Sequence, residues 1–266
     1  MLVLEVDDEA ARCEVCGGRG WIVEGEGNAA RARPCDCRRR QLAPRLLTAA
    51  DIPERYRHCR VSNFQISHPD PAHAEQLVHA RSVAERYVES FLDAESGRFR
   101  ESGLLLIGPP GVGKTHLAAG ILAEIIERYK ARGLFVDFTS LLHHIQSTFD
   151  ASNPESKHQV LDPVIGAEVL VLDELGAQKP TLWVTDILYL IINRRYSERR
   201  PTLFTSNFRL DDEEGDAPID RAPSFAASSL SQRIPPTIVS RLREMAQPVV
   251  IEGDDFRVQK MYQHRL

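Results

Sequence analysis

The sequence predicts an α/β fold, in which a parallel sheet carries helices on both faces, preceded by a small cysteine-rich module. Short, continuous apolar runs such as Gly103 to Ile107 and Glu168 to Leu172 are typical of parallel strands that are buried on both faces. Apolar residues at helical spacing lie between such runs. Four of the five cysteines crowd into residues 13–37, which sets the N-terminal module apart. We therefore expect a module over 1–48, a linker over 49–72 and a main domain over 73–266.

Composition excludes several classes of protein. With 42% apolar and 27% charged residues in 266, the chain has the make-up of a soluble globular protein rather than a disordered one. Its apolar runs fall far short of the ~20 residues that span a bilayer, and its acidic N-terminus is unlike a signal peptide. We expect a cytoplasmic protein with no membrane partner.

Net charge is a poor guide to a nucleic-acid partner here. The total is −5, yet residues 31–60 carry nine arginines against three acids. A phosphate backbone responds to such a local patch and not to the total.

The cysteine cluster predicts a structural zinc site. Cys13 and Cys16 form one close pair, Cys35 and Cys37 a second, and two such pairs can complete a tetrahedron of thiolates. Gly17, Gly18 and Gly20 follow the first pair and supply the backbone freedom of a tight turn. A disulfide framework and four unrelated buried cysteines are the alternatives.

A basic segment follows the cluster. Residues Arg38 to Arg40 precede leucines at helical spacing, Pro44 is well placed to open a helical turn, and Ile52-Pro53 ends it. Both a solvated face and a nucleic-acid contact are consistent with these arginines. Farther on, apolar residues of 73–92 recur at helical spacing and predict a helix packed on the core.

Residues 108–115 form a phosphate-binding loop. An apolar strand, Gly103 to Ile107, leads into G-P-P-G-V-G-K-T, and the helical stretch His116 to Lys130 follows, which is the setting that the G-x-x-x-x-G-K-[ST] pattern requires. Glycines let backbone N–H groups surround phosphate oxygens, and the helix N-terminus adds its positive dipole end. We expect Lys114 to reach the β and γ phosphates and Thr115 to bind Mg²⁺. The expected nucleotide contacts are Gly108, Pro109, Pro110, Gly111, Val112, Gly113, Lys114, Thr115 and His116.

Two acids end a second buried strand. Asp173 and Glu174 follow a Val/Leu run, so they emerge at the carboxyl edge of the sheet, where α/β proteins bind ligands. Asp173 would complete the Mg²⁺ shell, and Glu174 would orient and deprotonate an attacking water. The reaction class is hydrolysis of a nucleoside triphosphate.

Three further segments surround these strands. A strand over Leu134 to Phe138 precedes residues 139–163, whose His143 and His144 we expect to be solvated. The stretch Thr181 to Arg199 is apolar on most faces, so Trp183 and Tyr189 are expected in the core. Its end gathers basic residues that either meet the helix dipole or contact DNA: Arg194, Arg195, Arg199 and Arg200.

The order of these motifs resembles the AAA+ ATPases, specifically the DnaC/IstB branch of helicase loaders and transposition helper proteins. The motifs are Gly108 to Thr115, Asp173-Glu174, Thr205 to Asn207, Ser240 to Leu242 and Glu252 to Arg257. They cover roughly residues 50–260, and the cysteine cluster resembles the zinc-binding N-terminus of some helicase loaders.

The resemblance implies a five-stranded parallel sheet without a full C-terminal lid. In it, the strand ending at Asn207 lies between the phosphate-loop strand and the Asp173 strand. Asn207 would sense the γ-phosphate, Arg241 would be the arginine finger that reaches a neighbouring subunit's ATP, and Arg257 would sense nucleotide within its own subunit. ATP, Mg²⁺ and Zn²⁺ are the implied cofactors.

The family leaves the biological role open. A replicative helicase loader, whose zinc module docks on the helicase, is favoured by the cysteine cluster. A transposition helper that acts with a transposase and a weakly hydrolysing nucleotide switch are the alternatives. Contact with single-stranded DNA and self-assembly in the ATP-bound state are implied for the first two.

Overall fold

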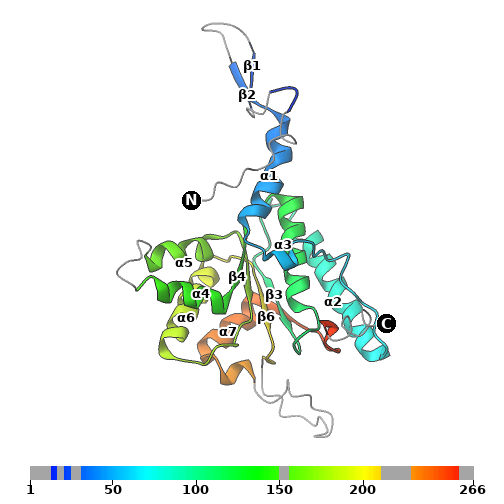
Figure 1. The fold of residues 1–266 in the computed structure, drawn as a ribbon, viewed down its shortest axis with the longest axis vertical. Coiled ribbons are helices and arrows are strands. Elements are labelled where there is room, and N and C mark those ends of the chain that lie inside the picture. Colours follow the sequence, from blue (N-terminus) through cyan, green and yellow to red (C-terminus); the bar gives the residue numbers. More distant parts are fainter. Residues whose placement is uncertain (1–12, 17–20, 25–30, 150–155, 211–228, 258–266) are drawn as a thin grey trace.

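A computed structural model describes residues 13–16, 21–24, 31–149, 156–210 and 229–257. The glycines after Cys16 lie outside these described residues. Figure 1 shows a central sheet covered by helices, with a hairpin at the far end of the first helix. Within the described residues, no helix combines the length and apolar character that crossing a membrane requires.

The N-terminal part is a hairpin followed by a helix. β1 (Trp21–Glu24) pairs antiparallel with β2 (Arg31–Pro34), and α1 (Asp36–Ala49) follows at once. Our expectation that Pro44 opens this helix is wrong, because α1 begins at Asp36 and Pro44 lies inside it. Proline fits the φ of a helix interior at the loss of one backbone hydrogen bond, and Cys35, which is extended, is the residue that precedes the helix.

The main sheet has five parallel strands in the order β4-β5-β6-β3-β7. They are β3 (Gly103–Ile107), β4 (Gly133–Asp137), β5 (Val169–Asp173), β6 (Thr202–Ser206) and β7 (Ala246–Val250). β6 lies between β3 and β5, which confirms the strand order that the family resemblance implies.

Alternating residues of the strands belong to two hydrophobic clusters, one on each face of the sheet. On one face, Leu104 and Leu106 of β3 pack with α2 (Pro71–Glu89) and α3 (Lys114–Tyr129). On the other, Leu105 and Ile107 pack with four helices. These are α4 (Phe138–Ser147), α5 (Lys157–Gly166), α6 (Leu182–Ser197) and α7 (Pro236–Met245). The expected α/β fold with helices on both faces is confirmed.

The segment between α1 and α2 is packed and not extended. It contains a short 3₁₀ turn over Glu54–Tyr56, and Ile52, Val61 and Phe64 are buried in the first cluster. Glu124 of α3 accepts a hydrogen bond from the Val61 backbone N–H at 2.7 Å. Residues 49–72, which we expected to be a linker, therefore contribute side chains to the core of the main domain.

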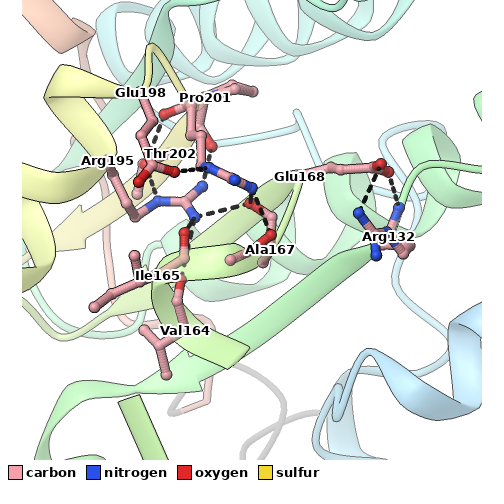
Figure 2. Close-up of polar contacts among 11 residues, drawn as sticks. Arg132, Val164, Ile165, Ala167, Glu168, Arg195, Glu198, Pro201 and Thr202 are labelled. Carbon is pink, nitrogen blue, oxygen red and sulfur yellow. Dashed lines mark hydrogen bonds and ion pairs between the residues drawn. The ribbon is translucent and has the colours of Figure 1, made fainter. Parts of the chain in front are cut away.

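The helix α6 corrects one expectation and decides between two alternatives for Arg195. Trp183 is half-buried against the second cluster, but Tyr189 is 42% exposed, so placing Tyr189 in the core is wrong. Conversely, Arg195 is fully buried. Its guanidinium donates to the carbonyl oxygens of Val164, Ile165, Ala167 and Pro201 and to the Thr202 hydroxyl, all within 2.8–3.1 Å (Figure 2).

Arg195 therefore joins three elements and is unavailable to DNA. The carbonyls at 164, 165 and 167 lie at the C-terminal end of α5, where no intrahelical donors remain. Burial lowers the pKa of Arg195 to about 9, so the side chain still carries its charge at neutral pH, where it meets the negative end of the α5 dipole.

Candidate functional site

The glycine-rich loop lies at the carboxyl end of β3 and leads into α3. Gly111 and Gly113 have φ values of 86° and 96°, which side chains with a Cβ rarely adopt. Gly113 is the residue that precedes α3. Because the loop ends at a helix N-terminus, its backbone N–H groups form a site suited to an anion.

Lys114 is folded back onto this loop. Its Nζ donates to the carbonyl oxygens of Gly108 at 2.8 Å and Pro109 at 2.7 Å. Burial lowers the pKa of Lys114 to about 8, and among the described residues the hydrogen bonds of its ammonium go to carbonyl oxygens and not to a carboxylate. A cation in this position at the loop is suited to a phosphate.

A continuous hydrogen-bonded chain links the loop to the two acids. The Thr115 hydroxyl donates to Asp173 Oδ1 at 3.0 Å, and the Thr205 hydroxyl donates to the same oxygen at 2.5 Å. Thr205 Oγ1 also accepts the Glu174 backbone N–H at 2.9 Å. Burial raises the pKa of Asp173 to about 6, because removal from water disfavours the charged carboxylate.

Thr205 has a role that its place in the sequence does not indicate. Its hydroxyl joins the strand β6 to the Asp173 carboxylate at the end of β5 and to the Glu174 backbone N–H. Glu174 itself is exposed, has a φ of 60° and lines the pocket beside it. The nearest sequence signal is Asn207, two residues farther along the chain.

A pocket opens beside the hydrogen-bonded series Thr115–Asp173–Thr205–Glu174. Most of the residues that the sequence predicts for nucleotide binding and catalysis line it. Asn207 and Arg257 lie on its wall, together with Arg55 and Tyr56 from the 3₁₀ turn, which the sequence did not indicate. Val112 lies in the core instead, and Arg241 is not on the wall. The pocket residues are Arg55, Tyr56, Pro110, Gly111, Gly113, Lys114, Thr115, His116, Glu174, Thr205, Asn207 and Arg257.

His116 is fixed by the packed segment before α2. Its Nε2 lies 2.8 Å from Asn63 Oδ1, and its Nδ1 lies 3.3 Å from the Cys59 thiol. Since an amide oxygen only accepts, the proton is on Nε2 and the Cys59 thiol donates to Nδ1. His116 thus anchors the first turn of α3 to the segment that carries Tyr56.

The second candidate site is the cysteine cluster beyond α1. The sulfur atoms of Cys13, Cys16, Cys35 and Cys37 lie within 4.8 Å of one another, and none forms a disulfide. The Cys13–Cys35 and Cys16–Cys37 sulfur distances are 3.7 and 3.3 Å. Four thiolates about 2.3 Å from a tetrahedral zinc would be about 3.8 Å apart, so the donor set fits a metal ion.

Crowding of the four sulfur atoms favours the neutral thiol when no cation is bound. The hydrogen bond with Cys16 and burial raise the pKa of Cys37 to about 12. A metal ion held by the cluster would stabilise the thiolate form instead.

Comparison with known proteins agrees with the fold and the loop. Residues 57–263 match the family described as IstB-like ATP binding protein. The replicative helicase loader DnaC of Escherichia coli is 30% identical over 157 residues, 59% of this chain and 58% of the relative. DnaI of Bacillus subtilis, also a replicative helicase loader, is 26% identical over 174 residues, 65% and 53% of the two chains.

A solved structure of the DnaC helicase loader is similar with a TM-score of 0.57 at 27% identity, covering 75% of this chain and 99% of that one. A structure of DnaA from Aquifex aeolicus, at 16% identity and a TM-score of 0.53, shares the fold. The chain spans a little over half the length of the curated relatives that it matches. The family match covers most of the chain, and so this protein belongs to the IstB-like ATP-binding proteins, in the DnaC/IstB branch of the AAA+ fold.

Proposed function

We propose that this protein binds ATP with Mg²⁺, hydrolyses it, and uses the cycle in a DnaC-like role in DNA replication, loading or remodelling a ring helicase on DNA. The observation that carries the chemistry is the chain Thr115–Asp173–Thr205–Glu174 beside the Lys114 ammonium. A hydroxyl and a carboxylate that could hold a metal ion lie beside an acid that lines the pocket, which supports this proposal.

Each residue has a distinct part in this proposal. The loop backbone holds the phosphates, and Lys114 leaves the carbonyls of its own loop to meet the β and γ oxygens. Thr115 and Asp173 would hold Mg²⁺, which neutralises charge on the phosphates when it is bound. Glu174 accepts a proton from the attacking water, and Asn207 donates to that water or to the γ-phosphate.

Arginines complete the site from two sides. Arg257 lies on the pocket wall and would contact the nucleotide within its own chain. Arg241 lies elsewhere and would act on the ATP of a neighbouring copy, which makes hydrolysis depend on a homo-oligomer. Such an arginine finger is worth about a thousandfold or more in rate.

The N-terminal module is proposed to hold zinc and to dock on the partner. It lies at the end of α1, away from the sheet (Figure 1), so it can contact another protein without closing the pocket. We place the module at residues 1–48, the connecting segment at 49–72 and the ATPase domain at 73–266, with single-stranded DNA bound during loading.

The catalytic part is tested with three variants. Lys114→Ala should lower ATP turnover by about a hundredfold or more, and Glu174→Gln should bind ATP but hydrolyse it about 10²–10⁴-fold more slowly. Lys179→Ala, which changes an exposed lysine outside the pocket, is the matched control. Wild-type turnover in Lys114→Ala would refute the site, and undetectable wild-type turnover with tight ATP binding would favour the nucleotide switch.

A transposition helper is the second candidate, because the matched family is IstB-like. The two roles differ in partner. Affinity capture from the source cell with the full chain should recover a ring helicase. Recovery of a transposase instead would assign the alternative role.

A further inference from the structure

Arg241 lies between two tyrosines of the neighbouring helix. Its guanidinium carbon is 5.1 Å from the centre of the Tyr189 ring and 5.6 Å from that of Tyr196. The two tyrosines are separated by two turns of α6, so they lie on one face of it. Arg241 projects from α7 into the space between the rings, and distances below 6 Å are those of favourable cation–π contacts.

A second link fixes one wall of this clamp. The Tyr196 hydroxyl donates to Glu244 Oε2 at 2.8 Å, and Glu244 lies three residues after Arg241 on α7. The hydrogen bond to Glu244 raises the pKa of Tyr196, which keeps its hydroxyl protonated as a donor. Tyr196 is thus held by its hydroxyl while its ring face meets the guanidinium.

Stacking leaves most of the guanidinium donors available. In the part of the chain that the structure describes, Arg241 donates to the Thr237 carbonyl at a long 3.4 Å, and no carboxylate lies at ion-pair distance. A ring contact occupies the flat face of the guanidinium, whereas its N–H groups point outward in the plane. The side chain is therefore oriented without using the donors that a phosphate needs.

We propose that Tyr189 and Tyr196 are positioning residues that hold Arg241 ready for the ATP of a neighbouring copy. The inference rests on the proposed function, since it concerns the arginine finger of that ATPase. Tyr189 is 42% exposed, so a neighbouring subunit can reach the surface on which Arg241 is held. The site with its phosphate loop is complete only when a second copy supplies this clamped arginine.

Steady-state ATPase kinetics of the full chain provide the first test. Tyr189→Leu and Tyr196→Leu should lower kcat by about two- to thirtyfold, the cation–π range expressed as a rate, while KM for ATP stays within about twofold. Tyr189→Phe keeps the aromatic ring and should therefore keep kcat near the wild-type value. A rise in kcat would mean that the clamp withholds Arg241, and an unchanged kcat would mean that it is irrelevant; either result overturns the proposal.

Mixed subunits separate positioning from folding. Lys114→Ala chains supply Arg241 but no working site, and Arg241→Ala chains supply the site but no finger, so their mixture should regain turnover. Adding Tyr189→Leu to the Lys114→Ala chain should reduce that regained turnover. Adding Tyr189→Leu to the Arg241→Ala chain should leave the regained turnover unchanged, because that chain has no Arg241 to hold.

The outcomes are distinguishable from failure of the proposed function. If Tyr189→Leu lowered the regained turnover equally in either chain of the mixture, Tyr189 would have only a structural role. If the mixture regained no turnover, Arg241 would not act on the site of a neighbouring copy. Either result refutes the clamp. Wild-type protein that does not hydrolyse ATP would refute the proposed function, and this inference with it.

Discussion

Replacing Arg195 with methionine should destabilise the main domain strongly without touching the pocket. The change removes five hydrogen bonds from a fully buried side chain. Two acceptors keep another donor: Ala167 O has Arg200 at 3.4 Å, and Pro201 O has the Leu170 N–H at 3.3 Å. The carbonyls at 164 and 165 at the end of α5 lose their guanidinium donor.

The size of the effect follows from those two orphaned carbonyls. Each buried acceptor without a donor costs about 1–3 kcal/mol, and removal of the buried charge offsets part of this. We therefore expect a loss of about 2–5 kcal/mol in the free energy of unfolding. For a domain of about 200 residues this lowers Tm by about 4–20 °C.

Urea unfolding followed by circular dichroism measures this loss directly. Arg199→Met is the matched control, because the Arg199 side chain is 74% exposed and pairs with Glu101 on the surface; it should change stability by less than about 1 kcal/mol. If Arg195→Met were as stable as Arg199→Met, the assignment of Arg195 as a buried cap of α5 would be refuted. Loss of DNA binding at full stability would show instead that Arg195 is a DNA contact.

Two further predictions concern the sheet and the metal. Gly103→Ala should cost about 1–3 kcal/mol in urea unfolding, because a Cβ there would lie 1.7 Å from the Thr202 carbonyl oxygen; Gly166→Ala, where nothing lies within 4 Å, is its control, and equal stability of both variants would contradict the close approach of β3 and β6. Prolonged chelation should release zinc and speed proteolysis within residues 13–37 while leaving the melting of the main domain unchanged. Purified protein without zinc, or a module that still resists protease after chelation, would contradict the metal site.

The phosphate loop was predictable because its physics is local. The glycines at residues 111 and 113 and the lysine and threonine that follow must stand close together in the sequence to surround a phosphate. The pattern can therefore be recognised from the sequence alone. The order of the strands in the sheet could be predicted only from the resemblance to a family. Nothing in the sequence of β6 states that it pairs with β3 on one side and β5 on the other.

Residues whose role depends on a distant partner were missed. Thr205 is one of many threonines in apolar strands until β5 is placed beside it, when its hydroxyl meets both Asp173 and Glu174. Tyr56 precedes the loop by more than fifty residues and reaches the pocket only because the segment before α2 packs on α3. Pairings of this kind are set by tertiary packing, which no local pattern reports.

The phase of α6 explains where its tyrosines and Arg195 lie. Leu188, Ile191 and Arg195 recur at i, i+3 and i+7 and form the buried face, whereas Tyr189 and Tyr196 lie about a third of a turn away, at the edge of that face. Placing Tyr189 in the core followed its residue chemistry, and helical phase contradicts it.

Arg195 of α6 and Arg241, which stacks on α6, differ in the N–H donors that remain available to a ligand. Arg195 donates to the carbonyls at the end of α5 and is buried, so it cannot reach a phosphate although it stays charged. Arg241 is held through its ring contacts and keeps its donors. For these two arginines, therefore, the hydrogen bonds that each side chain already makes, and not the density of positive charge along the chain, decide which of them can act on a phosphate.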